Sequence, residues 1–493
     1  MAAVQSAMPV CAVLLPLSAA VLILLSRRHE NVREGWTILA AVANFAIVLS
    51  ILPQILAGNR VECTLIELLP GIDVALRVDA FGMIFALTAS GLWVATSFYS
   101  IGYMRTLREH ALTRYFFSFA VAIAAALGIA FSANLLTMFV FYEILTVSTY
   151  PLVVHTETEE ARRAGRKYFA YLLFAGVSFL FSVVLTYYLT GTTDFAPGGF
   201  LAGTGPVLLQ QILFVTFLIG FAKAAWMPMH GWLPSAMVAP TPVSALLHAV
   251  AVVKAGVFGI VRVVCFVYGL ELTAEIGMST LLAAIAAATI ILGSLFALQQ
   301  DNLKRRLAYS TISQLSYILL GVALLTPMGI TGAMIHIPFH GFMKITLFFC
   351  AGALIATAGK EYISDMKGIG RQMPVTMLMF AIGAIGICGL PPVCGLITKW
   401  YLVLGAMQAH QLIAFLVIIT SSVLNIFYFF PIIHTAFFEE PDDGEQGVRE
   451  APLFMLVPLV ITGVGSLLLF LAPDLPFLRL VELAVGELVG VLP

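Results

Sequence analysis

The sequence predicts an all-α, polytopic membrane protein of about fourteen transmembrane helices. Of its 493 residues, 61% are hydrophobic and only 10% are charged, and the mean hydropathy is +1.01. A water-soluble domain carries about 25% charged residues, so water is not the main solvent of this chain. Apolar runs long enough to cross a bilayer recur from end to end, and they leave no stretch for a soluble catalytic domain. Helices are expected because they satisfy their own backbone polar groups in lipid.

Each predicted span is an apolar run of about the 17–25 residues that a bilayer-crossing helix needs. In chain order, the predicted spans lie near residues 5–26, 34–57, 79–102, 113–131, 134–154, 168–190, 207–227, 242–267, 278–298, 305–323, 331–356, 375–406, 411–438 and 452–472.

The distribution of Lys and Arg predicts the orientation of these spans. The odd-numbered connections hold most of the basic residues: Arg27, Arg28, Arg33, Arg105, Arg108, Arg114, Arg162, Arg163, Arg166, Lys167, Lys304, Arg305, Arg306, Lys360, Lys367, Arg371 and Arg449. The even-numbered side holds Arg60, Arg77, Arg262 and Arg479. By the positive-inside rule, the odd connections are cytoplasmic and both termini lie outside. We therefore expect a multi-pass protein of a prokaryotic cell (inner) membrane.

The remaining basic residues are four lysines inside the spans, and one carboxylate shares that environment. These residues are Lys223, Lys254, Lys344, Lys399 and Glu143. A charge at the bilayer centre costs at least about 2.5–3.5 kcal/mol, so these groups are expected to face one another or internal water and to act in ion movement. Two plainer interpretations stay open: Lys223 near its span end could snorkel to the interface, and Glu143 could form a structural ion pair.

Three intramembrane histidines add groups that can relay protons near neutral pH. His336, His340 and Lys344 follow one another at intervals of four residues, which places them along one slowly rotating stripe of a helix. His248 and Lys254 are six residues apart and lie about 120° from a common face, so water or a neighbouring helix would have to bridge them. His248 could equally be a hydrogen-bonded core histidine.

Two proline-rich stretches interrupt spans close to lysines. WMPMHGWLPSAMVAPTP (226–242) follows Lys223, and GLPPVCGL (389–396) precedes Lys399. Proline removes a backbone hydrogen bond and breaks or kinks a helix. Broken helices at membrane depth are tolerated where they line a cavity or are buried in protein, and transporters use them at ion sites. A lysine beside such an opening would find water and free carbonyl groups, although an ordinary kink remains the alternative.

The two breaks also indicate an internal repeat. Spans four to eight and nine to thirteen are sets of five, and each set has a break in its fourth member. An odd number of helices per unit requires the second copy to be inverted in the membrane. We therefore expect an N-terminal three-helix segment (1–112), two five-helix repeats (113–267 and 268–438), and a cytoplasmic loop, last helix and short tail (439–493).

These residues resemble a known family. YEILTVSTYPLV with Glu143, FAKAAWMPMHGWLPSAMVAPTPVSALLHAVAVVKAG and GLPPVCGLITKWYLV are similar to the antiporter-like subunits of respiratory complex I, Mrp-type cation/proton antiporters and membrane-bound hydrogenases. The resemblance implies a polar axis along which Glu143 pairs with Lys223. It further implies that His248 and Lys254 connect the half-channels, and that His336, His340 and Lys344 continue the axis toward Lys399.

Within this family, Lys399 and a tail (474–493) too short for a long lateral helix favour the D-type subunit of an Mrp sodium/proton antiporter. A proton-pumping subunit of M, N or L type from an NADH-quinone oxidoreductase or a hydrogenase is the alternative. The tail is expected to form a short amphipathic segment at the membrane surface.

The expected partners are other integral membrane subunits of a hetero-oligomeric complex, the lipid bilayer, protons and sodium, with no nucleic acid. We expect a transporter subunit without redox chemistry of its own. The six cysteines are scattered and form no CxxC pair, so no cofactor and no metal is expected. A haem-binding membrane protein using His248, His336 and His340, and a scaffold with a vestigial polar axis, are alternatives from other classes.

Overall fold

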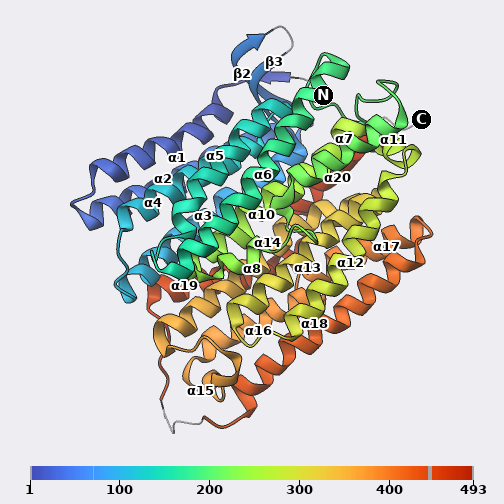
Figure 1. Ribbon diagram of the computed structural model, residues 1–493. Helices are drawn as coiled ribbons and strands as arrows, with labels where there is room; N and C mark the ends of the chain where they lie inside the picture. The colour runs from blue at the N-terminus through green and yellow to red at the C-terminus, as the bar shows by residue number, and fades with distance from the viewer. Residues whose placement is uncertain (1–2, 70–71, 442–446, 491–493) are drawn as a thin grey trace.

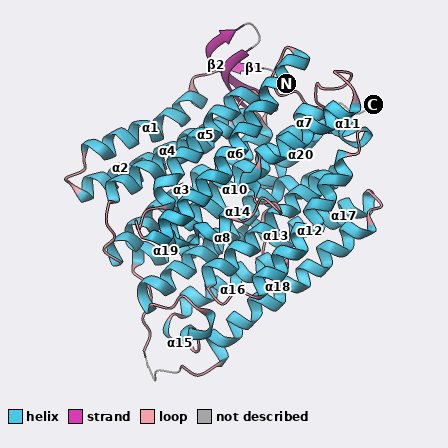
Figure 2. Ribbon diagram, in the orientation of Figure 1, coloured by secondary structure: helices cyan, strands magenta, loops and turns pink. Residues whose placement is uncertain are grey.

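The computed structural model describes residues 3–69, 72–441 and 447–490. Within these ranges the chain forms a bundle of long helices that run in nearly the same direction across the molecule, with one small sheet at an end of the bundle (Figures 1 and 2). Residues 442–446 of the predicted cytoplasmic loop lie outside the described ranges.

The α-helices, in chain order, are α1 (Met8–Leu25), α2 (Glu30–Leu56), α3 (Ala80–Thr106), α4 (Leu112–Ala130), α5 (Leu135–Val153), α6 (Glu159–Thr190), α7 (Val207–Gly220), α8 (Trp232–Ser235), α9 (Thr241–Ala245), α10 (Val252–Arg262), α11 (Leu270–Glu275), α12 (Met278–Leu298), α13 (Leu303–Ala323), α14 (Pro327–Ala358), α15 (Ile369–Gln372), α16 (Pro374–Cys388), α17 (Gly395–Gln408), α18 (Leu412–Phe438), α19 (Leu453–Leu471) and α20 (Arg479–Val489). Short 3₁₀ turns occur at η1 (Ala222–Ala224), η2 (Ala236–Val238) and η5 (Ile363–Asp365). Turns of π-helix occur at η3 (Leu246–Val250), η4 (Val263–Tyr268) and η6 (Asp474–Leu478).

The predicted all-α, multi-pass fold is confirmed. Eleven helical segments in the described ranges are long and apolar enough to cross a membrane. The remaining predicted spans correspond to α13, which has 21 residues and a more polar sequence, and to two interrupted segments built from α7 with α8 and from α16 with α17. The helix α6 begins earlier than predicted because Thr158 caps it by accepting a hydrogen bond from the Ala161 N–H at 3.1 Å.

The sheet was not predicted. The strands β1 (Ala3–Gln5), β2 (Arg60–Leu69) and β3 (Ile72–Val78) form it in that order, with β1 parallel to β2 and β3 antiparallel to β2. A sequence signal does exist, because the connection between the second and third spans alternates apolar and polar residues around Pro70–Gly71. The prediction missed it because the hairpin lies between membrane spans.

Both predicted breaks are present. The helix α7 ends at Gly220, and irregular backbone with short helical turns continues to α9. The helix α16 ends at Cys388 with Gly389 in the left-handed conformation (φ 82°), and α17 resumes at Gly395. In both places proline removes the amide donor that a continuous helix would need.

Helix lengths repeat in order through the two predicted five-span sets. The helices α4 and α12 have 19 and 21 residues, α5 and α13 have 19 and 21, and α6 and α14 have 32 each. Next come the interrupted segments that start with α7 (14 residues) and α16 (15 residues). The sets end with the helical segment over 241–268 (28 residues), which includes the π-turns η3 and η4, and with α18 (27 residues).

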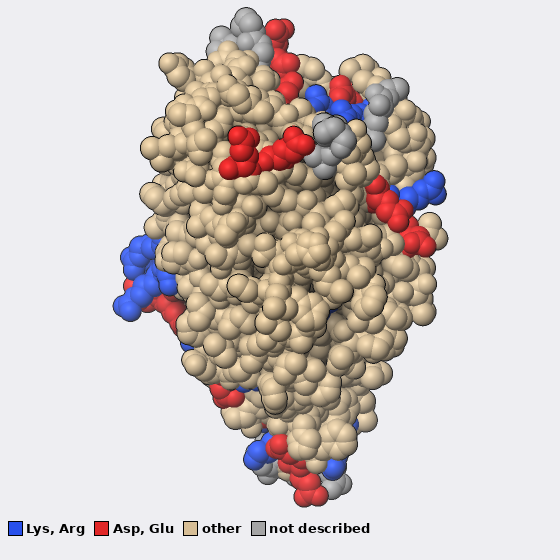
Figure 3. All heavy atoms as spheres, turned by 90° about the vertical axis from the view of Figure 1, so that its right-hand side faces the viewer, with Lys and Arg blue, Asp and Glu red and all other residues tan. Residues whose placement is uncertain are grey.

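The outer surface fits a lipid environment. Figure 3 shows one face on which acidic and basic atoms gather toward the two ends and the margins and leave the broad middle without charge. Both chain ends lie at the same end of the bundle in Figure 1. An ion pair links the N-terminal sheet to the C-terminal helix, because Arg60 Nη2 of β2 lies 2.9 Å from Glu487 Oε2 of α20. The tail forms the expected short helix, whose Leu480, Val481 and Leu488 are buried.

A second ion pair is buried at this end of the bundle. Arg262, at the end of α10, places Nη1 2.5 Å from Oδ2 and Nη2 2.7 Å from Oδ1 of Asp79, the residue before α3. The Arg262 side chain is 1% exposed, and the rings of Phe81, Phe258 and Phe266 surround its guanidinium group. This bidentate pair fixes the first helix of the bundle core to the last helix of the first five-span set.

We predict that replacing one member of this pair will strongly destabilise the protein. Arg262→Met leaves the Asp79 carboxylate buried without its partner, which costs about 3–5 kcal/mol in comparable sites. The measurement is thermal unfolding of the detergent-solubilised protein. Arg163→Met is the matched control because Arg163 pairs with Glu159 at the surface, where a pair contributes about 0–1 kcal/mol. Equal stability of the two variants would contradict this account.

Candidate functional site

The predicted intramembrane charges lie inside the bundle. The seven predicted lysines and histidines of the axis are between 0 and 6% exposed: Lys223, His248, Lys254, His336, His340, Lys344 and Lys399. Glu143 is half-buried, and its Oε1 is buried without a hydrogen-bond partner. None of the four lysine ammonium groups therefore snorkels to the surface, and each needs a polar partner within the protein.

Lys223 finds its partner on α5. The short 3₁₀ turn η1 directs its Nζ to the carbonyl oxygen of Tyr142 at 2.7 Å and over the Tyr142 ring, 3.1 Å from the ring centroid. The resemblance implied a pair with Glu143, the next residue along the chain. The two charges are close enough to interact, but the ammonium hydrogen bond in this structure goes to the backbone carbonyl rather than to the carboxylate.

A glycine makes room for the Glu143 carboxylate. A Cβ atom on Gly176 of α6 would collide with the Glu143 side chain, including Oε2 at 2.9 Å. The hydrogen atom at this position therefore allows the carboxyl group to lie against the α6 backbone. Sequence reasoning did not single out Gly176.

The carbonyl groups released by the first break are taken mostly by aromatic side chains. The Tyr142 hydroxyl donates to Gly220 O at 3.0 Å, and Trp232 Nε1 donates to Ala222 O at 3.2 Å. The expectation that Lys223 would use the carbonyls of its own break was therefore wrong. The break instead ends α7 so that η1 can turn Lys223 toward α5.

The middle of the axis is a direct contact between two helices. Lys254 of α10 lies 2.9 Å from His340 of α14, measured from Nζ to Nδ1. His248 lies on the π-turn η3, next to the Phe348 ring with the ring centroids 4.7 Å apart, and both of its ring nitrogens are buried without a hydrogen-bond partner. A π-turn realigns the side chains that follow it and is frequent at functional sites. Lys254 and His248 are thus brought to the same helix, α14, without bonding each other.

The histidine stripe leads from this contact to the second break. The rings of His340 and His336 lie 5.4 Å apart on successive turns of α14. His336 Nδ1 lies 3.0 Å from Thr398 Oγ1, and Thr398 precedes Lys399 in α17. Lys399 donates to Cys388 O and to Ser422 Oγ, both at 2.9 Å. Because Cys388 ends α16, this lysine does use a carbonyl that the break leaves free, as predicted.

Lys344 reaches the same break by a second route that the sequence analysis missed. Its Nζ donates to Ser310 Oγ at 2.9 Å, and Ser310 Oγ lies 3.1 Å from the hydroxyl of Tyr428. The Tyr428 hydroxyl donates to Asn425 Oδ1 at 2.7 Å, and Asn425 Nδ2 donates to Ile387 O at 3.0 Å. The spacing of Asn425 and Tyr428 on one face of an apolar helix was the available signal.

Lys304 is a further buried lysine, although the sequence analysis placed it in a cytoplasmic connection. It is 6% exposed, and its Nζ donates to Ala239 O at 2.6 Å, in the irregular backbone that follows α7. It also lines a polar pocket of about 420 Å³ together with Glu109, Glu160 and Glu361. The sequence analysis missed the burial of Lys304 because this residue lies near the start of a predicted span, where a basic residue is normally assigned to the adjacent loop.

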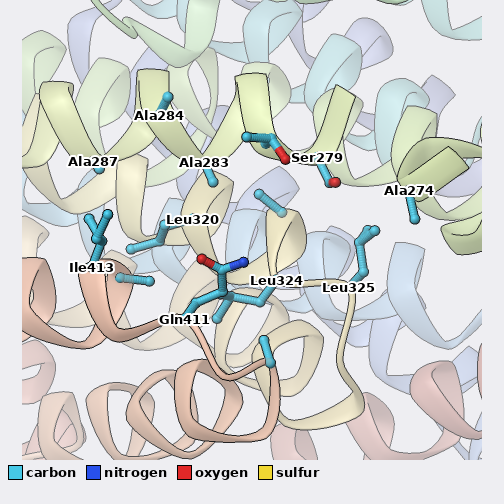
Figure 4. Close-up of a pocket in the computed structure, with 14 residues that line it drawn as sticks. Ala274, Ser279, Ala283, Ala284, Ala287, Leu320, Leu324, Leu325, Gln411 and Ile413 are labelled. Atoms are coloured by element: carbon cyan, nitrogen blue, oxygen red, sulfur yellow. The ribbon is translucent and has the colours of Figure 1, made fainter. Parts of the chain in front are cut away.

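Another cavity of about 420 Å³ has a different character. It lies between α12, the end of α13 and the start of α18, and alanine and leucine side chains dominate its lining (Figure 4). Gln411 directs its amide toward the alanine-rich face of α12. No titratable side chain lines this cavity, so it is not part of the polar axis.

Comparison with known proteins identifies the class of membrane protein to which this arrangement belongs. The family described as NADH:quinone oxidoreductase/Mrp antiporter, TM, matches residues 132–425, which include both breaks and the whole axis. The chain belongs to this family of antiporter-like membrane proteins.

Several relatives match along nearly the whole chain. The NADH-quinone oxidoreductase subunit N of Desulforudis audaxviator is 32% identical over 94% of this chain and 95% of its own length. The A-type subunit of the Na(+)/H(+) antiporter of Alkalihalophilus pseudofirmus is 30% identical over 91% of this chain, which spans 59% of that longer protein.

Two solved structures share the fold. One protein of the Mrp complex from Dietzia sp. DQ12-45-1b superposes with a TM-score of 0.88 at 22% identity, covering 98% of this chain and 97% of that one. One protein of an archaeal membrane-bound sulfane sulfur reductase also gives a TM-score of 0.88, at 26% identity and 98% coverage of both chains.

We predict that Tyr428→Phe will destabilise the protein by about 1–3 kcal/mol, because it leaves buried polar groups of Ser310 and Asn425 without their partner. Thermal unfolding in detergent measures the effect. Tyr188→Phe removes the same hydroxyl from a side chain that is 81% exposed and serves as the control. A Tyr428→Phe variant as stable as the Tyr188→Phe variant would show that the hydroxyl bridge does not hold α13 to α18.

Proposed function

We propose that this chain moves protons through the membrane along the central Lys/His/Glu axis, as one component of a multisubunit ion transporter. The proposed proton-transfer residues are Glu143, Lys223, His248, Lys254, His336, His340, Lys344 and Lys399. The observation that carries the proposal is the 2.9 Å contact between Lys254 and His340, since it joins titratable groups of the two five-span sets inside the bundle.

The hydrogen bonds define what each part of the axis can do. A proton on Lys254 Nζ can pass to a neutral His340 across their contact, because a neutral imidazole nitrogen accepts. The His336 ring lies one turn away on α14, and its contact with the Thr398 hydroxyl lets a proton pass toward the adjacent Lys399. The hydroxyl groups of Ser310 and Tyr428 extend a hydrogen-bonded path from Lys344 toward the second break, where Asn425 accepts from Tyr428 and fixes its hydroxyl. Water within the bundle would have to complete the step from Lys223 to Lys254.

The preferred parent assembly is an Mrp-type sodium/proton antiporter, in which this chain takes the place of the D-type subunit. The fold shared with a protein of an Mrp complex and the lysine at position 399 support this choice. A proton-pumping component of an NADH-quinone oxidoreductase is the second candidate, because the relative named subunit N matches over 95% of its length. Identification of the proteins that co-purify with the chain from native membranes distinguishes the two.

We further propose that both termini face the outside of a prokaryotic inner membrane. The shared location of the two ends and the concentration of Arg and Lys in the opposite connections support this orientation. The proposed division is 1–112, 113–267, 268–438 and 439–493, with the middle two units related by inversion, and the matched helix lengths support it.

We predict that Lys223→Ala, Glu143→Gln and Lys399→Ala will each lower proton transport about 10²-fold or more, because each removes a group that carries or balances the proton. The measurement is pH-gradient formation by the assembled complex in proteoliposomes. Lys167→Ala is the control, since Lys167 is exposed at the start of α6. If the assembled variants transported protons at the unchanged rate, the proposal that protons move along these residues would be wrong.

Gly176→Ala tests the position of the carboxylate without changing any titratable group. The added Cβ displaces Glu143 by overlap, and a displacement of about 1 Å at a reacting group costs on the order of 10²-fold in rate. Gly35→Ala is the matched control because nothing lies within 4 Å of the Cβ position on that helical glycine. If the two alanine variants transport equally well, Glu143 does not act from the position seen here.

A further inference from the structure

A cluster of metal-ligating side chains lies outside the axis, at the end of the bundle that carries most of the Lys and Arg residues. Glu109 and His110 belong to the connection between α3 and α4, and His155 follows α5. One ligand atom from each lies within 4.8 Å of the others. No sequence pattern indicates this cluster, because 45 positions separate His110 from His155 and no spacing motif links them.

The distances are close to those of a zinc site. Glu109 Oε2 lies 3.7 Å from His155 Nε2 and 3.9 Å from His110 Nδ1. Ligand atoms at the corners of a zinc tetrahedron, with bonds of about 2.0–2.2 Å, lie about 3.4 Å apart. The two distances from Glu109 exceed this value by about 0.3–0.5 Å, so a small contraction brings the carboxylate and each imidazole to bonding distance around Zn²⁺.

His155 provides the second, independent observation. Its side chain is 0% exposed, and neither ring nitrogen has a hydrogen-bond partner. A buried polar group without a partner is costly, so few occur in folded proteins. The backbone around the ring is fixed, because Arg114 donates to the His155 carbonyl at 3.1 Å and pairs with Glu157 at 2.5 Å. Nε2 thus faces the Glu109 carboxylate at 3.7 Å, beyond hydrogen-bond distance but close enough for both atoms to bind one cation between them.

The carboxylate is reachable from solvent. The Glu109 side chain is 20% exposed and that of His110 is 51% exposed, so a cation can enter from solvent. Two imidazoles and one carboxylate form a donor set typical of zinc rather than of Mg²⁺ or Ca²⁺, which prefer oxygen ligands.

We propose that Glu109, His110 and His155 form a zinc site that ties the connection between α3 and α4 to the end of α5. The fourth position is open to water on the exposed side of His110. The site is independent of the proposed proton axis, because none of its ligands belongs to that axis. Bound Zn²⁺ clamps the end of the helix that carries Glu143 to the neighbouring connection.

The test is Zn²⁺ binding by the purified, chelator-treated protein in detergent, measured by competition with a fluorescent zinc indicator. We expect one Zn²⁺ per chain and at least tenfold weaker binding in Glu109→Gln and in His110→Ala. Both residues are partly exposed, so these variants should fold, and size-exclusion chromatography checks this. An excess of Mg²⁺ should not displace the metal.

His434→Ala is the matched control. His434 also faces a carboxylate, with Nδ1 3.6 Å from Glu439 Oε1, but no third candidate ligand joins that pair among the described residues. This variant should bind Zn²⁺ as the unchanged protein does. X-ray absorption should show nitrogen and oxygen neighbours with imidazole scattering. No stoichiometric binding, sulfur scattering, or unchanged affinity in Glu109→Gln and His110→Ala would each overturn the proposal.

Discussion

An ammonium group buried in a membrane protein needs an acceptor to replace water, and this requirement shapes the backbone here. The acceptors are mainly backbone carbonyl oxygens: those of Tyr142 for Lys223, Leu307 for Lys344, Cys388 for Lys399 and Ala239 for Lys304. A regular helix commits its carbonyls to the next turn. The chain must therefore either break a helix, which frees carbonyl groups, or use helix carbonyls that still have a free lone pair. The choice made at each lysine determines where its ammonium group lies.

Both solutions occur, and they differ in where the acceptor carbonyl lies. Lys399 and Lys304 use carbonyls at helix ends, where no amide follows to claim them. Lys223 and Lys344 instead bind carbonyls in the interior of α5 and α13. In both helices a threonine four residues further on shares that carbonyl, Thr146 at 3.2 Å and Thr311 at 2.9 Å. Such back-bonding often opens a helix slightly and leaves the carbonyl accessible to a second donor, so the acceptor helix is not interrupted at that carbonyl.

These local solutions set the limit of what could be predicted from the sequence. Residue type and position in an apolar run were enough to find the charged members of the axis, because a charge in a span is rare and costly. Neutral residues such as Ser310, Asn425 and Tyr428 cost little free energy in a membrane span, so their presence there does not mark them as functional. Their contacts with one another appear only when α13 packs against α18. The hydrogen-bond partner of each lysine could not be predicted from the sequence either. Lys223 bonds Tyr142 rather than Glu143 because of the 3₁₀ turn η1, and this turn depends on a few backbone dihedral angles directly after α7 ends.

The two predicted five-span sets differ in the helix that carries their buried charge. Gly176 and Lys344 occupy the same position, counted from the helix start, in the 32-residue helices α6 and α14. In the first set the charge is therefore on α5, as Glu143 lying against Gly176, while in the second set it is on α14, as Lys344 bonded to Ser310 of α13. Of the predicted axis residues, each helix pair holds one charged group, and the two groups have opposite sign. A repeated scaffold thus places a carboxylate at one end of a line of cationic and neutral bases. In the proposed pathway, a proton on that line is attracted toward the Glu143 end unless Lys223 already neutralises the carboxylate, so the state of this pair would set the direction in which the proposed axis is biased.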